Sequence, residues 1–591
     1  MKIKVWSQFH PAASLHNPRL LATMLEDWEH MPNLVPHDFT FTDTLPPLGT
    51  KIALDTETDG SGGIGRWSIA WRDSLTNKLM VHTFYGPQKM FPTDKYVVIG
   101  HNLKYDNREL IAQGMKAPDP NHQLDTMIEA YCKSLGRQAP KEDGKRSSGV
   151  NMVGGLGLKY LARRWLGMHM HTWQEVKDNP EIQIEYNAGD SIGTYLLDEL
   201  WTPTMPKHFY DIDMPLLPVL MKMEDRGIYV DQAVLLGLGK EIDNELAGVD
   251  LPVNPFSPPQ LQSLLYGYLE LEPWKFTDTG APSVDDEVLE VIDNPLVQQI
   301  LAYKRLAKER GTYVENYLKA RGEDGRIHPE IKQTSTSTGR LSVARPALQN
   351  VFKRDDRVKL RAFLAAPPGY SIIRADFNQL DFRTLAAITQ DPILLKALNA
   401  NKKIHQVTAD EMGIPYDQAK TINFGLMFGQ EAWALSGSLH ITINEARDFL
   451  KRYFERFPGI KKYKEEMTEI IKRDKKVTIP FTGRTRRIDA MYVENWKINQ
   501  EGIREGINTP VQGLEAEVMK TVMIDLDQKF NAPLVLQIHD EVLLEVPTKD
   551  VKEYAHWLND YIPTVCHFGG MNYPVEVGYG DSWYTAMKNV I

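Results

Sequence analysis

The chain has little cysteine and no long apolar run. Two cysteines, Cys132 and Cys566, occur among 591 residues, which supports neither a disulfide framework nor a cysteine zinc site and indicates a reducing compartment. No segment approaches the roughly 20 apolar residues of a membrane helix. The N-terminal residues MKIKVWSQFHPAASLHNP contain no apolar core of a secretory signal. The sequence therefore predicts a cytoplasmic protein without a membrane partner.

The chain also lacks an excess of positive charge. Its formal net charge of −10 argues against a protein that coats nucleic acid through bulk attraction. Basic residues instead gather at 304–326 and 461–487. Acidic neighbours balance most of the second region, as on a solvated helix face, but its end, GRTRR at 483–487, lacks that balance and favours a phosphate contact. A length of 591 residues predicts about three to five domain-sized units.

One stretch places carboxylates inside apolar sequence. Residues 533–547 read PLVLQIHDEVLLEVP, in which two runs rich in Val and Leu flank His539, Asp540 and Glu541, a pattern that predicts a buried β-hairpin. Two adjacent carboxylates are costly to desolvate there unless a cation binds them. Taken alone, such a pair more often marks a solvated turn, so a second carboxylate strand is needed to favour a metal.

That second strand is predicted at 370–377, where it delivers Asp376 to its end. Asn378 is the expected N-cap of a helix that follows over 380–388. Asp376 and Asp540 then meet on neighbouring strand ends, where they can hold two Mg²⁺ ions about 4 Å apart. One ion lowers the pKa of an attacking hydroxyl and the other stabilises the leaving oxygen, which is the chemistry of phosphoryl transfer.

A second set of acidic residues lies upstream. Asp55 and Glu57 share one face of a predicted strand, because strand side chains alternate. Another strand leads into a predicted turn with Asp106, and a four-residue spacing stacks Tyr186 over Asp190 on a helix. Four carboxylates and a tyrosine can form a two-metal site in which water is the nucleophile and Tyr186 orients it.

These motifs, Asp55-x-Glu57, Asn102-x₃-Asp106 and Tyr186-x₃-Asp190, resemble those of DEDDy-type 3′–5′ exonuclease domains. The remaining chain resembles a family A DNA polymerase of the bacterial polymerase I type. The resemblance implies an α/β multidomain fold, with an RNase H-like exonuclease domain followed by a right-hand polymerase domain of palm, fingers and thumb.

The resemblance also implies domain boundaries. The exonuclease domain is expected at 1–202 and the polymerase domain at 203–591. No 5′-nuclease domain is expected before them, an arrangement similar to phage replicative polymerases. The polymerase subdomains are expected as a thumb at about 252–332, a palm at about 203–251, 333–395 and 520–591, and fingers at about 396–519.

The primer-template contacts are expected around TSTGRLS at 336–342 and LQN at 348–350, which resemble the family's TxTGRLS and LQN elements. Arg340 is implied to reach minor-groove acceptors that every correct base pair presents, so that it tests geometry rather than base identity. The other residues with expected DNA contacts are Arg354, Arg504, Asn508, Gln512 and His539.

The stretch YDQAKTINFGLMFG at 416–429 resembles the family's fingers helix. Tyr416, Lys420, Phe424 and Phe428 recur every four residues and share one face. Lys420 is implied to bind the triphosphate and to protonate the leaving pyrophosphate, Phe424 to pack on the sugar and Phe428 to border the templating base. The alternative is an amphipathic core helix with a snorkelling lysine.

The resemblance assigns the remaining site residues. His405 is expected to contact phosphate, with Gln379 and Asp381 also in the nucleotide site. Glu541 is expected to be catalytic. The expected metal ligands are Asp376, Phe377 and Asp540 in one site and Asp55, Glu57, Asp106 and Asp190 in the other.

Three residues depart from the family's pattern. Tyr416 stands where an arginine is usual, Asp381 stands where a glutamate blocks a ribose 2′-hydroxyl, and Phe428 replaces a frequent tyrosine. Because none of these changes touches Asp376 or Asp540, they bear on nucleotide selection rather than on catalysis.

The expected function is template-directed DNA synthesis from primer-template DNA and dNTPs with proofreading, by a monomer that uses two Mg²⁺ ions per site, with Mn²⁺ as a substitute. Phage genome replication, accessory replication proteins and a preference for 2-aminoadenine are further expectations. Two alternatives stay open: an exonuclease on a body that no longer synthesises DNA, and a non-catalytic primer-template binding module.

Overall fold

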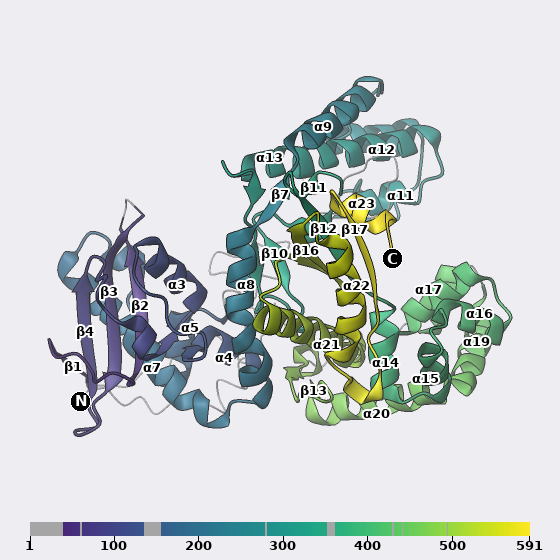
Figure 1. The fold of residues 1–591 in the computed structure, drawn as a ribbon. Helices are drawn as coiled ribbons and strands as arrows, with labels where there is room; N and C mark the ends of the chain where they lie inside the picture. Colours follow the sequence, from purple (N-terminus) through teal and green to yellow (C-terminus); the bar gives the residue numbers. More distant parts are fainter. Residues whose placement is uncertain are drawn as a thin grey trace.

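The structure, a computed structural model, describes residues 39–59, 62–134, 155–277, 280–351, 361–427, 431–439, 441–492 and 495–591. Figure 1 shows a purple and blue N-terminal body beside a larger body, with helix α8 (Met214–Arg226) between them. None of the helices in this described part of the chain combines the length and apolar character of a membrane span.

The N-terminal body is built on a six-stranded mixed sheet in the order β1-β4-β3-β2-β5-β6. Its strands are β1 (Phe39–Phe41), β2 (Lys51–Thr58), β3 (Ile64–Arg72), β4 (Leu79–Tyr85), β5 (Val97–Gly100) and β6 (Gln123–Asp125). Its helices are α3 (Leu103–Ala112), α4 (Thr126–Cys132), α5 (Leu158–Leu166), α6 (Trp173–Val176) and α7 (Pro180–Trp201). The continuous apolar run Ile52-Ala53-Leu54 is fully buried, because α7 packs on β2 and β3 while α3 packs on β2 and β5.

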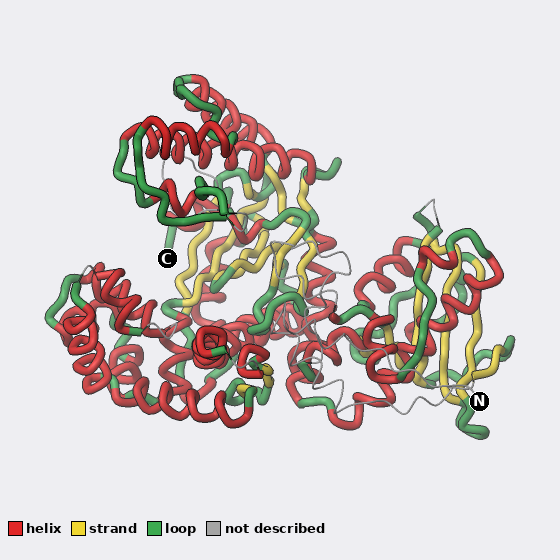
Figure 2. The backbone as a smooth tube through the Cα atoms, turned by 180° about the vertical axis from the view of Figure 1, so that it is seen from behind, coloured by secondary structure: helices red, strands yellow, loops and turns green. Residues whose placement is uncertain are grey.

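The larger body has a four-stranded antiparallel sheet at its centre, in the order β15-β16-β12-β17. The strands are β12 (Tyr370–Phe377), β15 (Leu534–Ile538), β16 (Glu541–Pro547) and β17 (Val575–Gly580). The predicted hairpin and the predicted strand at 370–377 are therefore confirmed. Figure 2 shows these strands between two helical arms.

The first arm and its junction with the sheet come mostly from residues before 345. The helices are α9 (Gln232–Ala247), α10 (Pro258–Gln262), α11 (Asp286–Glu290), α12 (Pro295–Glu309) and α13 (Asn316–Ala320), with π-helical turns η5 (Ser263–Tyr268) and η6 (Arg310–Glu315). The short strands are β7 (Ile228–Val230), β8 (Arg326–Ile327), β9 (Glu330–Lys332), β10 (Ser342–Ala344) and β11 (Leu364–Ala365).

The second arm and the helices that cover the sheet follow β12. They are α14 (Leu380–Thr389), α15 (Pro392–Asn399), α16 (Ile404–Met412), α17 (Tyr416–Met427), α18 (Ala432–Leu439), α19 (Ile443–Arg456), α20 (Pro458–Asp474), α21 (Trp496–Phe530), α22 (Val551–Tyr561) and α23 (Trp583–Lys588), with strands β13 (Lys476–Thr478) and β14 (Thr485–Arg487). The expected N-cap of α14 was wrong. Gln379, not Asn378, is the N-cap, in the left-handed region at φ 52° and without a side-chain cap bond.

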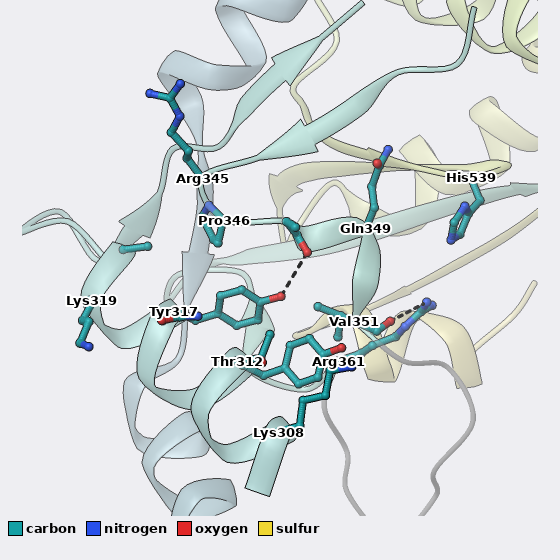
Figure 3. A pocket seen from close by; sticks show the side chains of 14 residues that line it. Lys308, Thr312, Tyr317, Lys319, Arg345, Pro346, Gln349, Val351, Arg361 and His539 are labelled. Carbon is teal, nitrogen blue, oxygen red and sulfur yellow. Dashed lines mark hydrogen bonds between the residues drawn. The ribbon is translucent and has the colours of Figure 1, made fainter. Parts of the chain in front are cut away.

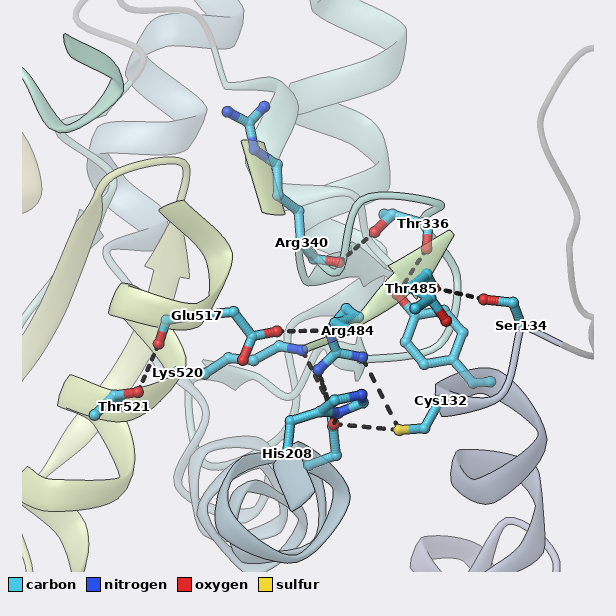
Figure 4. Close-up of polar contacts among 12 residues, drawn as sticks. Cys132, Ser134, His208, Thr336, Arg340, Arg484, Thr485, Glu517, Lys520 and Thr521 are labelled. Atoms are coloured by element: carbon cyan, nitrogen blue, oxygen red, sulfur yellow. Dashed lines mark hydrogen bonds and ion pairs between the residues drawn. The ribbon is translucent and has the colours of Figure 1, made fainter. Parts of the chain in front are cut away.

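A buried ionic cluster joins the two bodies (Figure 4). Asp213, at the end of the π-helical turn η4 (Phe209–Asp213), accepts hydrogen bonds from Arg484 at 2.7 Å, Lys520 at 3.2 Å and His208 at 2.8 Å. The Cys132 thiol of α4 lies 3.2 Å from the same carboxylate. Positive charge from two cations therefore stabilises the buried Asp213 carboxylate and holds its pKa well below the usual range, against the effect of burial.

The cluster corrects the interpretation of GRTRR as a free phosphate contact. Arg484 is buried and also donates to Glu517 at 2.5 Å, while Arg486 donates to Glu505 at 3.1 Å. The balancing acids lie on η4 and α21, far away in sequence, so local composition could not reveal them.

Replacing Asp213 by Ala should destabilise the protein by about 3 to 5 kcal/mol, because it leaves buried cations without their anion. Denaturant unfolding measures this loss. The matched control is Asp211→Ala in the same turn, which breaks an exposed pair with Lys207 and should cost less than about 1 kcal/mol. Equal losses in the two variants would contradict a stabilising role for the cluster.

Candidate active sites

The sheet of the larger body brings Asp376 and Asp540 together. Asp376 is the penultimate residue of β12 and pairs in register with Glu541 of β16. Asp540 lies in the tight turn between β15 and β16, and its carbonyl accepts a hydrogen bond from the Phe377 amide at 2.9 Å. The two carboxylates thus stand on neighbouring strand ends, as the sequence pattern predicts. Carboxylate oxygens are the ligands that Mg²⁺ prefers.

Two buried arginines beside these carboxylates were missed by the sequence analysis. Arg361 donates to one oxygen of Glu541 at 3.1 Å, and Arg374 donates to the other. Arg374 also pairs with Asp376, which lies two residues further on the same strand face. The Arg361 guanidinium stacks 3.7 Å over the ring of Trp583. Glu541 is therefore an anion held between two cations, which favours a positioning role rather than direct contact with substrate.

A cavity of about 650 Å³ opens beside Asp540. It is lined mainly by α14, α21, the hairpin turn and the loop before β10. The lining residues are Thr336, Arg340, Leu341, Gln349, Gln379, Leu380, Asp381, Phe382, His405, Glu515, Ala516, Met519, Lys520, Gln537, His539 and Asp540. Six residues with expected nucleotide, DNA or metal contacts, Arg340, Gln379, Asp381, His405, His539 and Asp540, thus share one cavity.

Polar contacts fix several of these side chains. The Gln379 side-chain amide donates to the Lys402 carbonyl at 3.0 Å and accepts from the Ile404 amide at 2.8 Å, so it joins the start of α16 to the start of α14. Burial, together with the nearby charge of Glu515, raises the pKa of Asp381 to about 7. Arg340 forms an ion pair with Glu515.

Helices α16 and α17 bring His405, Tyr416 and Lys420 together. The His405 ring lies 5.8 Å from that of Tyr416 and within hydrogen-bonding distance, 3.2 Å, of the Asn423 amide. Burial and the charge of Lys420 lower the pKa of His405. Lys420 is exposed on α17. Two neighbouring helices therefore place the imidazole of His405 close to Lys420.

Some expected contacts lie outside the described residues. Arg354 and Phe428 fall in the gaps, and Phe424 lies on α17 with a side chain that is not described. On α21, Arg504 is exposed and Gln512 half-buried, while Asn508 has a buried Oδ1 with no hydrogen-bond partner among the described residues.

A second cavity, of about 1120 Å³, lies between the first helical arm and the sheet (Figure 3). Its lining residues from α12, α13 and the segments after them include Lys308, Lys319, Arg345 and Arg361. His539 lines both this cavity and the smaller one. The basic surface therefore leads directly to the carboxylates at the strand ends.

The N-terminal body holds a second carboxylate group. Oxygen atoms of Asp55, Glu57 and Asp190 all lie within 4.8 Å of one another. Asp55 and Glu57 come from one face of β2, and Asp190 comes from α7. The Tyr186 hydroxyl forms a hydrogen bond with Glu57. The structure thus brings together four of the five residues predicted for this site.

Asp106 lies beside this group but not in the predicted turn. It belongs to α3 and accepts hydrogen bonds from the amide and hydroxyl of Thr56 at 3.0 and 2.7 Å. The helix starts early because the distant Asp125 carboxylate accepts from the Leu103 amide at 2.7 Å. A cap supplied from another strand leaves no local sequence signal.

Electrostatics at this site favour a cation. Burial and mutual repulsion raise the pKa of Asp55 well above its usual range, and mainly burial raises those of Asp106 and Asp190 to about 7. Lys159, 3.4 Å from Asp190, offsets only part of this. Oδ1 of Asp190 is buried without a hydrogen-bond partner in the described part of the chain. This all-oxygen donor set fits Mg²⁺ or Mn²⁺.

Cys132, His208 and Asp213 form another close group of metal-ligand types. The arginine and lysine bound to Asp213 already supply its positive charge. We assign this group to the ionic cluster rather than to a metal.

The fold and the two carboxylate groups describe a multidomain α/β protein whose central sheet carries acidic strand ends between two helical arms. A sequence profile of DNA polymerase family A matches residues 236–585. The match covers more than half of the chain, which therefore belongs to DNA polymerase family A.

Individual relatives agree with this. The chain is 32% identical over 422 residues to DNA polymerase I of Geobacillus stearothermophilus, covering 66% of this chain and 47% of that protein. It is 29% identical over 603 residues to DNA polymerase I of Treponema pallidum, covering 94% and 57%. The chain thus spans about half the length of these curated relatives.

A solved structure shares the fold. It is described as the POL domain of Pol1 from M. smegmatis in complex with DNA primer-template and dNTP. It superimposes with a TM-score of 0.76 at 24% sequence identity, covering 91% of this chain and 96% of that chain. The α/β multidomain fold predicted from the sequence is therefore confirmed.

Metal binding at the N-terminal site should strengthen as pH rises from 6 to 8. Asp106 and Asp190 have raised pKa values of about 7, so binding displaces protons below pH 7 and displaces few above it. Each displaced proton should change the Mn²⁺ affinity about tenfold over this range. Calorimetry in an Asp376→Ala background, which removes a carboxylate of the other candidate site, measures this change.

The control for this titration is Asp106→Asn, which removes one titrating group and should reduce the pH dependence. An affinity that stays constant between pH 6 and pH 8 would contradict the assignment of these carboxylates as metal ligands.

Proposed function

We propose that this protein extends DNA primers on a template strand, with dNTPs as substrates. The observation that carries the proposal is the cavity where Asp540, beside Asp376, meets His405, Asp381 and Arg340. The basic second cavity, joined to it through His539, supports a path for the DNA duplex, because lysine and arginine bind phosphates without reading sequence.

Different residues of the larger body are proposed to bind metal, to bind the triphosphate and to donate a proton. Asp376 and Asp540, with Phe377 between them, hold Mg²⁺, which activates the primer hydroxyl and stabilises the leaving pyrophosphate when bound. Lys420, with His405 beside it, binds the triphosphate, and Lys420 donates a proton to the leaving group. Tyr416 and Gln379 border this site.

The rest of the nucleotide and DNA contacts belong to the same proposal. Phe424 and Phe428 contact the nucleotide and the templating base, and Asp381 faces the sugar. Arg340 reads the minor groove of the terminal base pair. The further DNA contacts are Arg354, Arg504, Asn508, Gln512 and His539.

The N-terminal body is proposed to be a 3′–5′ exonuclease that removes mismatched primer ends. Asp55, Glu57, Asp106 and Asp190 hold divalent metal, and Tyr186 orients the attacking water. The hydrogen bond from Tyr186 to Glu57 supports this role. The proposed boundaries are 1–202 for this domain and 203–591 for the polymerase domain, with the palm, fingers and thumb as given above.

Separate substitutions should separate the two activities. Asp376→Ala or Asp540→Ala should abolish primer extension while single-stranded DNA is still degraded, because each change removes a ligand from one site. Asp55→Ala with Glu57→Ala should keep extension and let mismatched ends persist. Gel assays of both activities with and without Mg²⁺ measure this.

Each variant serves as the control for the other in these assays. Loss of nuclease activity in Asp376→Ala would refute two separate sites. Degradation without any extension by the wild type would favour an exonuclease with an inactive polymerase-like body, and the absence of both activities would favour a binding module.

The proposal extends to the oligomeric state, the biological role and the base preference of the protein. The protein acts as a monomer in the cytoplasm, replicates a phage genome with accessory proteins, and prefers 2-aminoadenine over adenine. The added amino group lies in the minor groove and adds a hydrogen bond to thymine, which stabilises the primer end against excision. In a competition between the two triphosphates opposite thymine, the wild type should favour 2-aminoadenine. Equal incorporation of the two triphosphates would contradict this preference.

A further inference from the structure

Helix α21 carries a carboxylate that the proposed catalytic roles do not use. Glu515 is buried, and its Oε2 pairs with Nη2 of Arg340. Both residues line the cavity that also contains Asp540. Figure 4 shows that the Arg340 side chain points away from the buried ionic cluster, and nearly half of it is exposed. The ion pair is therefore part of the cavity wall.

The position of Glu515 on the helix extends a polar face. Asn508, Gln512 and Glu515 occur at i, i+4 and i+7 and so share one side of α21. The first two are proposed DNA contacts, and the buried Oδ1 of Asn508 has no partner among the described residues. Glu515 lies at the end of this row nearest the cavity.

A carboxylate at this point is electrostatically unfavourable on its own. Burial and the charge of Asp540 raise the pKa of Glu515, and Arg340 lowers it. Glu515 in turn raises the pKa of Asp381. A buried acid among other acids, in a site proposed to bind an anionic polymer, needs hydrogen-bond donors to offset its desolvation. Arg340 supplies one to Oε2, and Oε1 can accept another.

The minor groove offers such a donor on some base pairs. Every pair presents the acceptors N3 or O2, but only a purine with a 2-amino group presents a donor. An arginine can donate to the N3 acceptor of such a purine, and a carboxylate beside the arginine can accept from the neighbouring 2-amino group. Guanine and 2-aminoadenine both carry this arrangement, whereas adenine and hypoxanthine lack the amino group.

We propose that Glu515 is a specificity residue that accepts a hydrogen bond from the 2-amino group of a purine at the primer terminus. The inference rests on the proposed function, in which Arg340 contacts the minor groove of that base pair. Arg340 donates to N3 and at the same time holds the Glu515 carboxylate in place. The pair thus favours extension of primers whose last base is a purine with a 2-amino group, which is either guanine or 2-aminoadenine.

The test compares primers that differ in their last base. Single-nucleotide addition is timed from ends with guanine or hypoxanthine opposite cytosine, and with 2-aminoadenine or adenine opposite thymine. All enzymes carry Asp55→Ala and Glu57→Ala to suppress excision. Because the amino group also adds a base-pairing hydrogen bond, the diagnostic quantity is the change of each rate ratio between Glu515 and its variants.

The ratio of amino to non-amino ends should fall about tenfold in Glu515→Ala, as expected for a lost hydrogen bond to a charged group. Glu515→Gln keeps an acceptor oxygen and the side-chain size, so it should keep part of the preference and also controls for misfolding. Glu505→Gln is the matched control on the same helix, where Glu505 pairs with Arg486 away from the cavity, and should leave the ratios unchanged.

Other outcomes would overturn the inference. Equal slowing from all four ends would mean that Glu515 only positions Arg340, and a fall with 2-aminoadenine but not with guanine would exclude recognition of the shared amino group. Unchanged ratios in Glu515→Ala would also refute it while leaving the proposed polymerase intact. Absence of extension from every primer by the enzyme with intact Glu515, in Mg²⁺, would instead refute the proposed function itself.

Discussion

The register between β12 and β16 is the constraint on which the larger body depends. It sets Asp376 opposite Glu541, while β17 sets Glu576 on the other side of Asp376. Three carboxylates at adjacent strand ends repel one another, and a low local dielectric strengthens that repulsion. Arg374 and Arg361 reduce this repulsion, because both are buried and both donate to Glu541. These ion pairs therefore let the sheet hold several carboxylates at adjacent strand ends.

Repulsion among carboxylates is offset by a different cation in the N-terminal site. Its positive partner is Lys159, which lies 3.4 Å from Asp190 and stacks 3.8 Å over the ring of Tyr186. Burial raises the pKa values of Asp106 and Asp190 to about 7, and Lys159 offsets only part of this effect at Asp190. The proposed metal would therefore have more negative charge to neutralise here than in the larger body, where Arg361 and Arg374 already pair with Glu541.

Sequence reasoning succeeded where local pattern determines structure and failed where a distant residue does. The β12 strand and the β15–β16 hairpin follow from apolar runs, and α17 follows from helical spacing. The helical setting of Asp106 depends on a cap from Asp125, and the burial of Arg484 depends on Asp213, which lies 271 positions away. The sequence did not indicate a role for Glu515, because that role depends on its ion pair with Arg340, which lies on another element. Spacing along one element is visible in a sequence, whereas partners between elements are not.

The contact between the two bodies links the loop that carries Arg340 to the N-terminal body. The Tyr131 hydroxyl of α4 donates to the Thr336 carbonyl at 2.8 Å, and the Thr336 hydroxyl donates to the Arg340 carbonyl at 2.7 Å. Ser134 donates to the Thr485 carbonyl at 2.6 Å, and the ionic cluster lies directly beneath (Figure 4). The loop that holds Arg340 is thus attached to the N-terminal body by hydrogen bonds as well as to its own sheet. Hydrogen bonds therefore run without a break from α4 through Thr336 and Arg340 to the carboxylate of Glu515, so the two proposed sites lie on elements that are bonded to each other.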